Sequence, residues 1–169
     1  LSLFPFVGHA KDLSSMGLVD VTAAPFYADP NGEIDCTESL QKAIDYAQDQ
    51  HKVAYFPDGV YKISNTLECR HDPPRPDKRG RFESGRYWGI TLLGSKSGKN
   101  RPRIVLAPHS MGYENVGQPR LVLYFHQGRP RSQPPIYPRM APSFMNSRLI
   151  GIDVEIGEGN PGAVAVRMR

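Results

Sequence analysis

Residues 29–67 read DPNGEIDCTESLQKAIDYAQDQHKVAYFPDGVYKISNTL, and this stretch decides the expected fold. It joins an acidic glycine turn, a helical pattern and an alternating apolar pattern in direct succession. Asp35 followed three residues later by Glu38 matches a capping box, in which a side chain accepts the first free backbone N–H groups of a helix. The sequence therefore predicts a helix that begins near Thr37.

The helix is expected over about 37–50, because apolar residues recur on one face at helical spacing. The remaining surface is polar and charged, so the apolar stripe must pack against another part of the protein. The residues of the stripe are Leu40, Ala43, Ile44 and Ala47.

After the helix the pattern changes from helical spacing to alternation, which indicates strands. The segment 53–56 is typical of a buried strand, and Pro57-Asp58-Gly59 predicts a tight turn before the next alternating segment. A short leading strand is expected near 18–22. Further short apolar strands are expected at 89–94, 103–106, 121–125, 147–156 and 162–168.

Two segments without periodicity, about 70–88 and 126–146, are predicted to be long surface loops. Short strands separated by such insertions are typical of a solenoid. A β-sandwich would also accommodate the later strands, but it would not explain a single helix placed before them.

Three motifs resemble the amino-terminal signature of the pectate-lyase-like superfamily, in particular its rhamnogalacturonase and epimerase-like branch. They are Asp29-x-Asn31-Gly32-x-x-Asp35-x-Thr37, Ala43-Ile44-Asp45, and Tyr55-Phe56-Pro57-x-Gly59-x-Tyr61-x-Ile63-Ser64. The stretch 153–165 also resembles a turn between successive levels of that branch. The resemblance covers about 19–67 and 149–169.

This resemblance implies an all-β fold, an incomplete right-handed parallel β-helix, or solenoid, with one amino-terminal capping helix at about 37–50. Residues 1–169 would form the amino-terminal portion of a single β-helix domain. The absence of an initiator Met and of a convincing signal peptide favours a trimmed or partial chain.

For function, the resemblance implies a carbohydrate-active protein that acts on a polysaccharide as a glycoside hydrolase or polysaccharide lyase, in a secreted or periplasmic location. This segment alone is expected to be inactive, because family members carry out their chemistry on later levels of the fold. The alternative is a non-catalytic β-helix for carbohydrate binding or attachment, such as a tailspike or surface stalk. No cofactor is evident, and calcium remains an option for the complete protein.

Composition restricts the partners. The chain of 169 residues has 22% charged residues and a net charge of +4, as expected for a soluble globular domain. No segment approaches the roughly 18 continuous apolar residues of a membrane span. The basic excess lies within 70–103, where either an acidic polysaccharide partner or a solvated loop would explain it. Nucleic acid is not an expected partner, because the basic segment lacks interleaved aromatic residues and no recognised module is present.

Asp153 and Glu155 are the candidate catalytic residues, since a glycosidase needs two carboxyl groups across one bond. Alternation along their strand places both side chains on its outer face, roughly 6.5–7 Å apart. Two solvent-facing acids on a strand are the ordinary alternative. No metal site is predicted, because no Cys and His spacing resembles one.

Substrate binding would need aromatic faces with charged residues beside them. Such clusters occur in both long loops, although burial of the rings beneath the loops is the competing interpretation. The candidates are Arg86, Tyr87, Trp88, Tyr137 and Arg139. The sequence allows two alternatives for Cys36 and Cys69, namely a disulfide between them or two buried free thiols.

Overall fold

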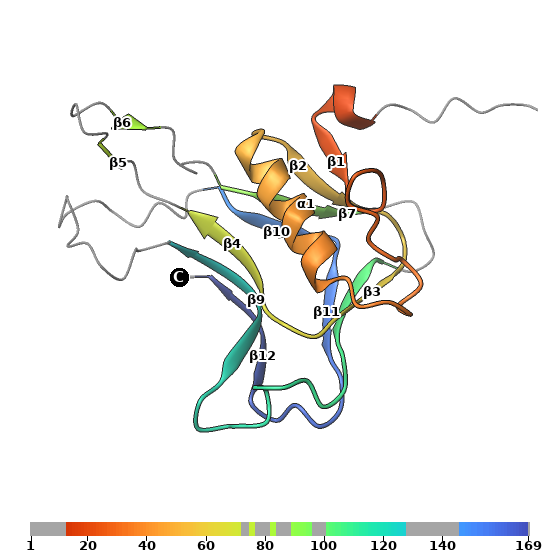
Figure 1. The fold of residues 1–169 in the computed structure, drawn as a ribbon, viewed down its shortest axis with the longest axis vertical. Coiled ribbons are helices and arrows are strands. Elements are labelled where there is room, and N and C mark those ends of the chain that lie inside the picture. The colour runs from red at the N-terminus through yellow and green to blue at the C-terminus, as the bar shows by residue number, and fades with distance from the viewer. Residues whose placement is uncertain are drawn as a thin grey trace, which may run out of the picture.

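A computed structural model of the chain describes residues 13–71, 75–76, 82–83, 89–95, 101–127 and 146–168 (Figure 1). One α-helix and a succession of short strands make up this part of the chain. In order, the elements are η1 (Leu13–Met16), β1 (Leu18–Asp20), α1 (Thr37–Asp49), β2 (Val53–Phe56), β3 (Val60–Ile63), β4 (Leu67–His71), β5 (Arg75–Pro76), β6 (Phe82–Glu83), β7 (Thr91–Gly94), β8 (Arg103–Leu106), β9 (Arg120–Gln127), β10 (Arg148–Ile150), β11 (Asp153–Ile156) and β12 (Ala163–Met168).

The longer strands form three parallel sheets. Sheet A has the order β1-β2-β7-β10, sheet B has β3-β8-β11 and sheet C has β4-β9-β12. Each successive group of three strands therefore adds one strand to every sheet. The short strands β5 and β6 pair separately and antiparallel.

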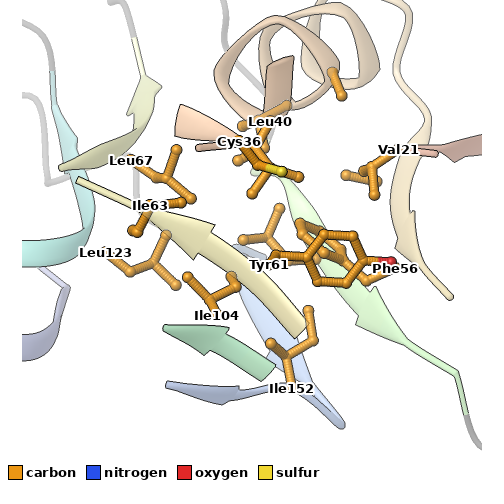
Figure 2. Packing of buried hydrophobic residues seen from close by; sticks show 14 of the residues in the cluster. Val21, Cys36, Leu40, Phe56, Tyr61, Ile63, Leu67, Ile104, Leu123 and Ile152 are labelled. Atoms are coloured by element: carbon orange, nitrogen blue, oxygen red, sulfur yellow. The ribbon is translucent and has the colours of Figure 1, made fainter. Parts of the chain in front are cut away.

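The register of the sheets stacks inward side chains above one another. Tyr61 lies beside Ile104 in sheet B, and Leu67 lies beside Leu123 in sheet C. All four belong to one buried apolar cluster, which also contains side chains of sheet A and of α1 (Figure 2). The three sheets and the helix therefore share a single core.

The predicted fold class, an all-β right-handed parallel β-helix, is wrong. The structure has mixed α/β content, with three parallel sheets of three or four strands and one helix. The apolar stripe of α1 is fully buried in the same cluster as the strands, and α1 packs against β1, β2 and β4. Because the helix is a constituent of the core, it is more than a cap on an all-β body.

The predicted helix at about 37–50 is confirmed as α1, but the capping box is wrong. The residue at the N-cap position is Cys36, which makes no side-chain capping hydrogen bond. Asp35 Oδ1 instead accepts hydrogen bonds from the Thr37 backbone N–H at 2.8 Å and from its hydroxyl at 2.6 Å. Glu38 forms an ion pair with Lys42, one turn along the helix.

Most strand predictions are confirmed to within a few residues. The segment 147–156 is two strands, because Gly151 adopts a positive φ of 65° and turns the chain from sheet A into sheet B. In the predicted loop at 70–88, β4 continues to His71, and β5 and β6 form a short pair. β9 likewise runs into the predicted loop at 126–146 as far as Gln127. The rest of the first loop and residues 128–145 of the second lie outside the described residues.

The turns between sheets B and C are joined by a buried asparagine. Asn160 is 5% exposed, and its amide donates to the carbonyl oxygens of Ala107 at 2.8 Å and Gly157 at 2.9 Å. Its Oδ1 accepts a hydrogen bond from the Ser110 backbone N–H at 2.8 Å. One side chain therefore binds the turn after β11 to the turn after β8.

Replacing Asn160 by Ala is expected to lower the free energy of unfolding by about 1–3 kcal/mol, because buried backbone groups lose their partners. Urea unfolding followed by circular dichroism measures this. Asn115→Ala is the matched control, since Asn115 is exposed and its side chain accepts a local hydrogen bond from the Gly117 backbone N–H. Equal effects of the two substitutions would contradict the role given to Asn160.

The turn before α1 is organised by one carboxylate. Asp29 accepts hydrogen bonds from the backbone N–H groups of Asn31 at 3.0 Å, Glu33 at 2.9 Å and Ile34 at 3.0 Å, and from the Asn31 amide at 2.9 Å. These hydrogen bonds, led by that from Ile34, hold the pKa of Asp29 below its ordinary value. The folded turn therefore stabilises the ionised form of the Asp29 carboxylate.

This depressed pKa makes the contribution of Asp29 to stability dependent on pH. The contribution is fully present above the unfolded-state pKa of about 3.9 and is lost as the pH falls through the lower folded-state value. The stability difference between the native protein and Asp29→Asn should therefore shrink below about pH 4. Chemical unfolding at pH 2.5–7 measures this, with Glu33→Gln as an exposed control in the same turn; a difference that does not change with pH would contradict the assignment.

Candidate functional site

A surface hollow lies between α1 and β4. Its volume is about 600 Å³. It is lined by Thr37, Glu38, Gln41, Asp45, Ser64, Asn65, Thr66, Glu68 and Arg70. The lining is polar throughout, so this hollow is suited to a ligand rich in hydrogen-bonding groups.

A second hollow of about 380 Å³ adjoins the first, on the side of β9. Its lining is Asn65, Thr66, Glu68, Pro119, Arg120, Leu121 and Tyr124. Because Asn65, Thr66 and Glu68 line both hollows, the two are neighbours and together reach from α1 across β4 to β9. We call the two hollows together the Glu68 groove.

The width of the groove is set by Gln41 of α1. Its Nε2 donates to the carbonyl oxygen of Glu68 at 2.9 Å, and its Oε1 accepts from the Glu68 backbone N–H at 2.8 Å. The side-chain amide thus binds β4 as a neighbouring strand would. β4 is an outermost strand of sheet C, so Gln41 covers part of an otherwise open sheet edge.

Outward-facing side chains of sheet C form a carboxylate, imidazole and phenol cluster. The register pairs Glu68 with Tyr124, two residues before His126 on the same strand. His126 Nε2 lies 3.3 Å from Glu68 Oε2, and the His126 and Tyr124 rings stack with centroids 4.3 Å apart and planes 14° apart. The side chain of Glu68 is 52% exposed and that of His126 is 16% exposed, so the carboxylate is the member open to a ligand.

Arg120 is held in place at the other end of the groove. Its Nη2 donates to Asn65 Oδ1 at 2.6 Å, and its Nη1 donates to the carbonyl oxygen of Met111 at 3.2 Å. The guanidinium carbon also lies 5.1 Å from the centre of the Tyr113 ring, within the range of a cation–π contact. The cation is therefore positioned before any ligand binds.

Tyr113 anchors the floor beneath Arg120. Its hydroxyl lies 3.0 Å from Thr66 Oγ1, and both hydroxyls are within hydrogen-bonding distance of the carbonyl oxygen of Leu121. Burial raises the pKa of Tyr113, although the hydrogen bond with Thr66 and the charge of Arg120 act in the opposite direction. The phenol is therefore neutral at physiological pH and serves as a fixed support.

The predicted catalytic residues Asp153 and Glu155 lie outside this groove, on β11 of sheet B. Arg103 Nη1 donates to both carboxylate oxygens of Glu155 at 3.1 Å, and Arg101 lies 3.8 Å from Asp153. Each acid thus faces an arginine, in an arrangement that also suits a surface ion-pair cluster. A catalytic role for the two acids stays a prediction.

The predicted binding residues Arg86, Tyr87, Trp88, Tyr137 and Arg139 lie outside the described residues. The two cysteines, Cys36 and Cys69, are buried free thiols, and burial raises the pKa of both. Within the described ranges no group of three or more His, Cys, Asp or Glu side chains could hold a metal ion. Over the same ranges no helix is long and apolar enough to cross a membrane.

Sequence reasoning missed Gln41, Glu68, Arg120 and His126. The alternation within the two strands was a usable signal. It places Glu68 and Arg70 on the outer face of β4, and Tyr124 and His126 on the outer face of β9. What the sequence does not contain is the pairing that brings these two faces together. A scan against protein-family models, and searches of curated proteins and of solved structures, found no match to this chain.

Replacing Gln41 by Ala is expected to lower the free energy of unfolding by about 1–2 kcal/mol, because the Glu68 backbone loses two hydrogen bonds. Thermal and urea unfolding measure this. Gln50→Ala at the exposed carboxyl end of α1 is the control. If both variants unfold alike, the amide does not hold β4 as described.

Proposed function

We propose that this chain binds a polysaccharide in the Glu68 groove. The observation that carries the proposal is that two neighbouring hollows reach from α1 across β4 to the aromatic ring of Tyr124. Hollows that follow one another along α1, β4 and β9 accommodate an extended ligand better than a compact one. The polysaccharide partner and the secreted or periplasmic location both stay proposals that rest on the family resemblance.

The side chains of the groove match the chemistry of a sugar chain. Carboxylate, amide and guanidinium groups of Glu68, Asn65 and Arg120 offer both acceptors and donors to hydroxyl groups. Tyr124 offers a ring whose one face already stacks on His126, so its aromatic plane is fixed. A sugar contains both hydroxyl groups and apolar C–H faces, and these features of the groove complement both.

Tyr124→Ala is expected to weaken polysaccharide binding by about tenfold, or ~1.4 kcal/mol, because an aromatic contact is lost. Isothermal titration calorimetry with a panel of neutral and acidic polysaccharides measures the affinity. Tyr55→Ala is the matched control, because Tyr55 alternates with the buried Ala54 and Phe56 on β2 and thus faces outward from sheet A. Absence of binding to every member of the panel, or equal losses in the two variants, would overturn the proposed function.

A second candidate function is cleavage of the bound polysaccharide by hydrolysis or elimination. The Glu68–His126 pair favours it, since a carboxylate beside an imidazole can exchange protons with a ligand in the groove. If the native chain releases reducing or unsaturated sugar ends, Glu68→Gln should abolish the release while binding persists. Asp153→Asn is the control, and loss of activity only in that variant would move the chemistry to sheet B.

A further inference from the structure

We propose that the outer face of sheet A is a self-association surface, which packs against the same face of a second copy of the chain. The outer face is the side of the sheet that points away from the shared core. This inference is independent of the proposed polysaccharide groove, which lies on α1, β4 and β9. It rests on the apolar character of the face and on the placement of its two charges.

Two rows of outward side chains make up this face. The row between them points inward and joins the buried cluster or packs against it; its members are Val19, Ala54, Leu92 and Leu149. Because side chains alternate along each strand, the rows on either side point outward. In strand order from β1 to β10, these two rows are Leu18, Val53, Thr91 and Arg148, and Asp20, Tyr55, Leu93 and Ile150.

The outer face is apolar over most of its area. Five of its eight side chains are apolar, all five are partly exposed, and none of the five belongs to the buried cluster. Within the described residues, the elements with the main contacts to sheet A are α1, whose buried stripe lies on the inner side, and η1, at β1. Parallel sheets in proteins are normally covered on both faces, and an apolar patch on a surface marks a site of association.

The two charges of the face lie at diagonally opposite corners. Asp20 is on β1 in one row, and Arg148 is on β10 in the other. Asp20 Oδ1 accepts hydrogen bonds from the Thr22 backbone N–H at 2.8 Å and from its hydroxyl at 2.7 Å. Among the described residues, neither Asp20 nor Arg148 has a partner of opposite charge. Both charges are therefore available to a molecule that packs on the face.

A second copy supplies the opposite charge at each corner. A two-fold axis that runs parallel to the strands, between two facing sheets, sets β1 of one copy over β10 of the other. Asp20 of each copy then lies over Ile150 of the other, two residues or roughly 6.6 Å along the strand from Arg148. A long arginine side chain spans this separation, so two ion pairs form at symmetric positions.

The apolar side chains meet in the same arrangement. Facing sheets pack about 10 Å apart with their strand directions within about 30° of each other, so that side chains of the two faces interdigitate. The inner strands β2 and β7 bring Tyr55 and Leu93 of both copies to the middle of the contact. The contact is self-complementary and closed, so assembly ends at a dimer.

The test is sedimentation velocity of the full chain over a range of concentrations. A reversible dimer is the expected result. Leu93→Lys should weaken the dimer at least about tenfold, because the contact would bury an unpaired charge. Val105→Lys is the matched control and should leave the dimer unchanged, since Val105 is an outward, partly exposed residue on the middle strand of sheet B. Equal effects of the two substitutions would contradict the assignment of the face.

A charge exchange tests which corners meet. Arg148→Asp alone should weaken the dimer, because it places like charges opposite each other, and the double variant Asp20→Arg with Arg148→Asp should restore it. Circular dichroism establishes that each variant remains folded, and the charge variants keep the test intact if Leu93→Lys does not fold. A native chain that is monomeric at all concentrations, an assembly that grows beyond a dimer, or a double variant that dimerises no better than Arg148→Asp would each overturn the proposal.

Discussion

Everything in this molecule depends on one constraint, namely that inward side chains of three parallel sheets and of α1 must meet in one core. The parallel register enforces this by placing like positions above one another, as in the column Tyr61, Ile104 and Val154. A slip of one residue in any strand would turn its apolar set outward. The turns are therefore as important as the strands, and Asn160 holds two of them at the required spacing.

Local features could be predicted from the sequence because their causes are local. The stripe Leu40, Ala43, Ile44 and Ala47 identifies α1, and β8 was predicted with its observed bounds. The fold class was wrong because a pattern of strands says nothing of how deeply a helix enters the core. The capping box was wrong by a single position, since Cys36 occupies the N-cap and Asp35 binds Thr37 from outside the helix.

The candidate site was largely beyond prediction, and the reason is physical. Glu68 and His126 are far apart in sequence and meet only through the register of β4 and β9. In the sequence, Gln41 is one of several polar residues of the helix, and only the structure shows that its side-chain amide binds the backbone of β4. By contrast, alternation alone predicts that Asp153 and Glu155 face outward. It does not predict the arginines that face them, which lie on β8 and just before it.

The two hydrogen bonds between Gln41 and β4 also affect how the groove would recognise a ligand. A single amide fixes the distance between a helix and a strand that form opposite walls of the same groove. The walls therefore do not have to close around a ligand, and little conformational entropy is lost when one binds. Such a site would select its ligands by their width. A ligand broader than the fixed gap would have to break the hydrogen bonds between Gln41 and the Glu68 backbone before it could enter.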